Sequence, residues 1–217
     1  FAISLTEPMV HKERLKSSWK SIFKVVHFSL VEHKTLRTHI IYSSVIGVST
    51  LMMAWLAQPF LKDIGVNMKN YGLVWALLNI IVGVFAFNAH TLEKRFTEFT
   101  SLYLIGFITV STYFFIGSHM SYFSLLILFI FYANRGYATP LLRNYINRYT
   151  ESNVRATVMS VRSFIIRISF AIIAPFIGWI ADNQSLNYAF YTMGIVGTIG
   201  ITYCLIWFYK NKEIDLK

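Results

Sequence analysis

Arginines within long apolar stretches are the residues of this chain best placed to do chemistry. Arg135, preceded by Asn134, lies well inside one such stretch, and Arg167 lies at a comparable depth in the next. At ~1.5 Å per helical residue, Arg135 lies on the order of 10 Å from the nearer end of its stretch. An arginine at that depth in a membrane is costly unless it faces protein, water or a counter-charge. We expect a cationic patch in a water-filled cavity that contacts an anionic or polar substrate or a gating carboxylate. The alternative is snorkelling to the headgroups or a structural bond at a helix end.

Further polar side chains interrupt the apolar sequence. Asn79 lies in the second stretch, and Gln58 and Trp55 lie near the end of the first. Lipid offers such groups no hydrogen-bond partner, so they turn toward a neighbouring helix or a cavity. The candidate cavity or substrate-binding residues are therefore Arg135, Asn134, Gln58, Trp55, Asn79 and Arg167.

Acidic residues are placed differently from the arginines. No Asp or Glu falls inside an apolar stretch, so a proton relay built on a buried carboxylate is not expected, although His90 could titrate. We expect Arg155 and Arg162, near the start of the fifth stretch, to anchor that helix at the headgroups.

The composition excludes a soluble protein. Hydrophobic residues make up 55% of the 217 residues and charged residues only 14%, less charge than a soluble surface requires. The formal charge of +10 is therefore assigned to membrane topology, with the lipid bilayer and not nucleic acid as partner. Cys204 is the only cysteine, which excludes an internal disulfide. The sequence has no phosphate loop, nucleophile elbow or paired metal ligands, so we expect no enzyme, metal site or cofactor.

Six apolar stretches are long enough to cross a bilayer as helices. They cover residues 39–61, 71–92, 99–117, 122–142, 158–181 and 188–209. The sequence therefore predicts an all-α membrane protein with a six-helix bundle over residues 38–217. Residues 1–37 form a basic cytoplasmic linker with an amphipathic helix, which suits an anionic membrane face or packing on its own protein.

The loops set the orientation. Basic residues gather in residues 11–37, 93–95, 143–155 and 210–217, whereas the loops at the other side hold only Lys62 and Lys69. The positive-inside rule therefore predicts that both termini are cytoplasmic.

A family resemblance rests on the fourth and fifth stretches and the turn between them. The sequences Asn134-Arg135-Gly136, Tyr145-Ile146-Asn147-Arg148 and Arg155-Ala156-Thr157-Val158-Met159-Ser160-Val161-Arg162-Ser163 resemble the tenth helix, loop and eleventh helix of major facilitator superfamily transporters. The resemblance implies the carboxyl-terminal half of a twelve-helix carrier in a bacterial inner (plasma) membrane. The missing amino-terminal six-helix half would be its partner, and a small solute would bind near the midplane between the halves. The first, second, fourth and fifth spans would face the cavity, and the third and sixth would face lipid.

One segment departs from the family pattern. Residues 90–96 are a poor copy of the family's gating motif, because its glycines are missing. By the resemblance, Glu93, Lys94 and Arg95 retain a charge-lock role at the cytoplasmic side.

The resulting expectation is a secondary active transporter of a small solute that works by alternating access. The alternative is a six-helix membrane scaffold or enzyme subunit that binds a partner through its basic arm, the linker of residues 1–37. A channel ranks third, because no charged ring or filter-like loop is present.

Overall fold

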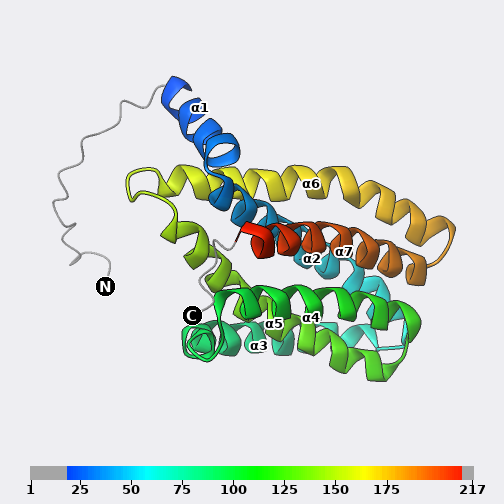
Figure 1. The fold of residues 1–217 in the computed structure, drawn as a ribbon. Helices are drawn as coiled ribbons and strands as arrows, with labels where there is room; N and C mark the ends of the chain where they lie inside the picture. The colour runs from blue at the N-terminus through cyan, green and yellow to red at the C-terminus, as the bar shows by residue number, and fades with distance from the viewer. Residues whose placement is uncertain (1–18, 212–217) are drawn as a thin grey trace, which may run out of the picture.

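The computed structural model describes residues 19–211, in which every regular element is a helix (Figure 1). The elements are α1 (Trp19–His27), η2 (Phe28–Glu32), α2 (Lys34–Asp63), η3 (Met68–Asn70), α3 (Tyr71–Glu93), α4 (Glu98–Ser118), α5 (Tyr122–Arg148), α6 (Arg155–Asn183) and α7 (Leu186–Asn211). The six helices from α2 to α7 are each long and apolar enough to cross a membrane. The all-α, six-helix prediction is confirmed. Residues 11–18 of the expected linker helix lie outside the described residues, and α1 covers part of the remainder.

Side chains and turns fix where the helices begin and end. Thr97 caps α4 by accepting a hydrogen bond from the Thr100 amide at 3.2 Å, and His33 caps α2 by accepting from the Leu36 amide at 3.1 Å. These bonds satisfy amides that have no partner within the helix. Gly65 follows α2 with a φ of 80°, a backbone conformation that is unfavourable for residues that have a Cβ. The chain thus reverses after Asp63 and enters α3.

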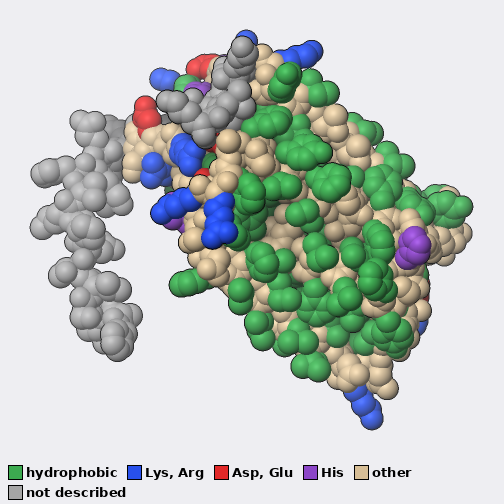
Figure 2. All heavy atoms as spheres, turned by 60° about the horizontal axis from the view of Figure 1, so that its bottom comes forward, with side chains coloured by type: hydrophobic (Ala, Val, Ile, Leu, Met, Phe, Trp, Pro, Cys, Tyr) green, Lys and Arg blue, Asp and Glu red, His purple; other side chains and the backbone are tan. Residues whose placement is uncertain are grey.

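The helices alternate in direction, which brings one set of helix ends together. We call this end, where α2, α4 and α6 begin and α3, α5 and α7 end, the basic end of the bundle. Its cationic residues include Lys34, Arg37, Lys94, Arg95, Arg148, Arg155 and Lys210. Figure 2 shows a broad hydrophobic face, with most of the visible Lys and Arg side chains gathered toward one end. This distribution is the one that a membrane-spanning bundle requires.

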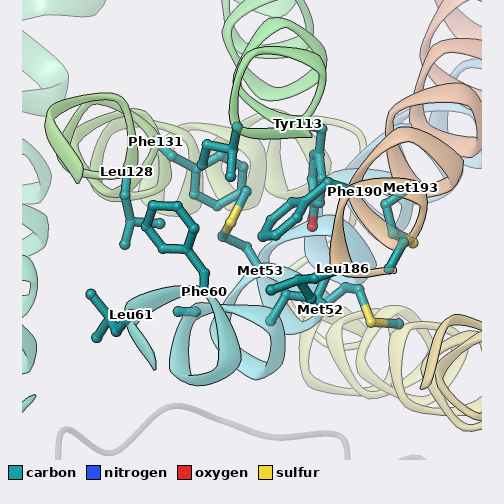
Figure 3. Close-up of a cluster of buried hydrophobic side chains, with 14 of the residues drawn as sticks. Met52, Met53, Phe60, Leu61, Tyr113, Leu128, Phe131, Leu186, Phe190 and Met193 are labelled. Carbon is teal, nitrogen blue, oxygen red and sulfur yellow. The ribbon is translucent and has the colours of Figure 1, made fainter. Parts of the chain in front are cut away.

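Helix α2 is the centre of the bundle and packs against α5, α6 and α7, while α4 packs against α5 and α7. Figure 3 shows one core cluster in which Met53 and Phe60 of α2 meet Tyr113 of α4, Phe131 of α5 and Phe190 of α7. In the most apolar 18-residue segment of each helix, the buried share is 61% for α2 but only 17% for α3 and 11% for α6. Helices α3 and α6 therefore lie at the margins of the bundle and present most of their surface outward.

A glycine holds α3 close to α5. A Cβ at Gly136 would lie 2.5 Å from the Val82 carbonyl oxygen of α3. This clash involves a backbone atom, so no change of side-chain rotamer could relieve it. Only glycine fits at this contact. Because Arg135 directly precedes Gly136, this contact also fixes the position on α5 from which the Arg135 side chain projects.

Candidate functional site

Arg135 of α5 and Asn79 of α3 lie on two helices that pack against each other. The Arg135 guanidinium lies over the Tyr132 ring, 5.5 Å from its centroid, and the Trp75 ring meets the same tyrosine edge to face at 6.0 Å. One turn further along α3, the Asn79 side chain donates to the Trp75 carbonyl at 2.8 Å. The Tyr132 hydroxyl is buried, and Arg135 is the charged side chain beside it. The Arg135 cation thus lies against a buried tyrosine, and the Asn79 amide is exposed on the neighbouring helix.

Asn134 faces a different way from Arg135. Its side-chain amide is buried and donates to the Ile105 carbonyl and the Thr109 hydroxyl of α4, each at 3.1 Å. The two neighbours in sequence therefore have separate surroundings. Asn134 joins α5 to α4, whereas Arg135 remains partly exposed on the α3 side.

Trp55 lies in a second region, between α2 and α6. Its ring is 67% exposed and meets Phe170 of α6 edge to face at 5.6 Å. Trp55 also lines a cavity of about 470 Å³, whose walls include Pro59, Asp63 and Asp182. Gln58 is exposed next to it on α2. This cavity lies toward the end of the bundle opposite the basic end.

Arg167 is exposed on α6, and within residues 19–211 it lies within ion-pair distance of no carboxylate. The structure thus places the predicted cavity residues in two groups, one on α3 and α5 and one on α2 and α6. Asn134 is outside both, because its contacts are with α4.

The basic end carries a cluster of four charged or titratable side chains, which we call the Arg148 cluster. Arg148 of α5 binds Glu93 at 3.1 Å and Glu98 at 3.0 Å. Glu98 also accepts from His39 of α2 at 2.9 Å, and the other ring nitrogen of His39 contacts the Thr35 carbonyl at 2.9 Å. The two glutamate side chains are 12% and 11% exposed and that of His39 is 1% exposed. These bonds tie α2, α4, α5 and the end of α3 together.

Of the three residues expected in a charge lock, Glu93 is in the Arg148 cluster. Lys94 and Arg95 are exposed in the following turn, and among the described residues neither forms an ion pair. The other three residues of the cluster, Glu98, Arg148 and His39, were not predicted from sequence to belong to this site. All three lie near helix ends on the basic side of the bundle, and this shared position could have predicted that they meet.

Arg155 and Arg162, both expected to anchor α6, lie in different surroundings. Arg155 is exposed and donates to the Thr150 carbonyl in the turn before α6, at 3.3 Å. Arg162 is only 8% exposed and its Nε donates to the Ser43 hydroxyl of α2 at 2.5 Å. Arg162 therefore points into the bundle.

The comparisons with known proteins agree with this architecture. A family model described as Major Facilitator Superfamily matches residues 38–216, which is most of the chain. The chain therefore belongs to the major facilitator superfamily, a family of membrane transporters and not of enzymes. No curated protein matches the sequence. Within residues 19–211, no group of three or more His, Cys, Asp or Glu side chains is arranged to hold a metal ion.

Proposed function

We propose that this chain is the carboxyl-terminal half of a twelve-helix secondary active transporter that moves a small solute by alternating access. The observation that carries the proposal is the exposure of α3 and α6, the two marginal helices. A carrier built from two six-helix halves needs such outward faces to enclose a path between them. The missing amino-terminal half would cover α3 and α6.

The polar groups support the same arrangement. The α3–α5 group contains Arg135 and Asn79, and the α2–α6 region contains Trp55, Gln58 and Arg167. We assign these residues to the walls of the solute path, because polar side chains in a bilayer persist where water or protein meets them. Asn134 instead keeps α4 against α5.

The Arg148 cluster would hold this half rigid while the halves rock. All four of its side chains belong to this chain, so moving one half against the other breaks none of these bonds. By the positive-inside rule, the basic end lies in the cytoplasm, as do both termini. We place the protein in a bacterial inner membrane.

The test uses the complete protein, including its other half, reconstituted in lipid vesicles. We expect saturable uptake of at least one solute from a broad panel under a proton or sodium gradient. Arg135→Ala should lower that uptake by about tenfold or more, as expected for loss of one charge-assisted hydrogen bond, with normal membrane insertion. Lys210→Ala, at the exposed end of α7, is the matched control and should transport normally. Absence of uptake across the whole panel would reject the transporter proposal.

A second candidate function is a membrane scaffold that binds a partner through the basic arm. The observation that favours it is the exposure of Phe23, Phe28 and Val31 within that arm, at 70%, 42% and 55%. Chemical cross-linking that captures a stoichiometric soluble partner would support this candidate. Cysteines introduced at Asn79 and Arg167 separate the two functions, because only a carrier changes their accessibility when solute is added.

A further inference from the structure

Arg162 is a buried cation with almost no partners. It lies seven residues into α6, so about 10 Å along that helix from its start, and it is 8% exposed. Its Nε donates to the fully buried Ser43 hydroxyl of α2. A guanidinium carries five N–H donors, and residues 19–211 supply no other hydrogen bond to Arg162 and no carboxylate within ion-pair distance.

A second arginine increases the positive charge at this place. Arg143, exposed on α5, adds an unfavourable electrostatic contribution at Arg162. The carboxylates at the basic end do not neutralise this pair: Glu93 and Glu98 bind Arg148, and Glu151 in the exposed turn forms no ion pair with either arginine. Among the described residues, neither arginine forms an ion pair with a carboxylate.

This arrangement is unfavourable in the protein alone. Burial removes water from Arg162, Arg143 adds repulsion, and a single hydroxyl replaces little of the lost hydration. An anion bound at the Arg162 guanidinium would reverse each of these effects. Carboxylates and phosphates match the forked geometry of guanidinium donors, and such contacts are the strongest hydrogen bonds that arginine makes.

The neighbouring contacts orient Arg162 for this role. Since Ser43 takes the Nε hydrogen, the two terminal nitrogens are left for an end-on bidentate contact. One turn beyond Ser43, a Cβ at Gly47 would lie 2.5 Å from Ile166 of α6, so α2 and α6 are in close contact there. The guanidinium is therefore held against α2, which also packs against α5, the helix that carries Arg143.

We propose that Arg162, oriented by Ser43, binds the carboxylate or phosphate group of an anionic solute. This inference rests on the proposed transport function and deepens it, because it names the class of solute. A competing source of the same oxyanion is a carboxylate side chain of the other half of the carrier. The two sources are distinguished by whether a soluble anion binds.

The experiment measures thermal unfolding of the complete purified protein in detergent by its intrinsic fluorescence. Sodium succinate and sodium phosphate are titrated at constant ionic strength, with succinamide as the uncharged counterpart of succinate. We expect succinate or phosphate to raise the unfolding temperature with saturation, and succinamide to have no effect. In Arg162→Gln the apparent affinity should fall about tenfold or more, and in Arg162→Lys it should fall less, because one charge remains without the fork.

Two controls keep the interpretation specific. Lys210→Gln removes one positive charge from the basic end and should bind the anion as the unaltered protein does. Size-exclusion chromatography shows whether Arg162→Gln is folded, and Arg143→Gln tests the site without altering the buried residue. A saturable response that is equally strong in Arg162→Gln, or no saturable response to either anion in the unaltered protein, would overturn the proposal. The second result would assign Arg162 to a carboxylate of the other half.

The anion-binding proposal and the transport proposal can be rejected independently of each other. If the anion binds through Arg162 but no solute moves in vesicles, the anion site stands and the transport function fails. If an uncharged solute moves and neither anion binds, transport stands and the anion site fails.

Discussion

Arg148 and Arg162 are both arginines of helices that reach the basic end, but their surroundings are opposite. Arg148 is half exposed and binds two nearly buried carboxylates, one of which also binds a buried histidine. Arg162 is nearly buried and has one hydroxyl as partner. A paired charge stabilises the fold that surrounds it, whereas an unpaired buried charge reduces stability and is retained for another purpose. Arg148 therefore joins helices to one another, whereas Arg162 is the arginine for which we propose anion binding.

The largest expected effect comes from removing the paired arginine. Arg148→Met leaves Glu93 and Glu98 close together without their cation, so two like charges remain in poorly hydrated positions. We expect a loss of about 2 kcal/mol of stability, below the range for fully buried pairs because Arg148 is half exposed. The measurement is the unfolding temperature in detergent, with Lys210→Met as control. An unchanged unfolding temperature would show that the Arg148 cluster does not stabilise the bundle.

The unpaired arginine should give a smaller effect of opposite sign. Arg162→Met replaces a buried cation by an apolar side chain of similar length, so without an added anion we expect a gain of about 1 kcal/mol. The same variant should lose the response to succinate and phosphate. The unfolding temperature is measured in chloride buffer beside that of Arg148→Met. A decrease in both variants would remove the distinction between the two arginines.

The smallest effect is expected at the turn after α3. Lys94→Gln and Arg95→Gln remove exposed charges that have no ion pair, so the unfolding temperature should not change measurably. The neighbouring Glu93→Gln provides the contrast, since it removes the negative charge that pairs with Arg148 and should lower that temperature. Equal effects at all three positions would indicate that net charge, and not pairing, determines stability here.

The fold could be predicted from sequence because the bilayer imposes a length and a polarity on each helix. The six apolar stretches correspond to α2–α7, but the helix ends were less predictable. Helix α5 continues to Arg148, beyond the expected end at residue 142. Amphipathic helical turns outside the hydrocarbon region carry no hydropathy signal, so the expected spans stopped early. As a result, Arg135 lies about 20 Å along the helix from its end at Arg148.

The candidate site was less predictable, because a sequence shows how deep a residue lies but not which way it points. Asn134 and Arg135 are adjacent, yet one faces α4 and the other lies over Tyr132. Similarly, His39 and Glu98 are 59 residues apart, and only the packing of α2 near α4 brings them together. The family resemblance predicted a charge-lock role for Glu93, Lys94 and Arg95, but the contact of Glu93 with Arg148 is visible only in the three-dimensional arrangement.

The lone cysteine of this chain has a practical consequence. Cys204 is fully buried in α7, and a buried thiol reacts poorly because its thiolate form is disfavoured. Water-soluble maleimides should therefore leave it unmodified in the folded protein. Thiol labels attached at chosen positions of α3 and α6 would then report on those positions against a silent background from this half, with its native cysteine left in place.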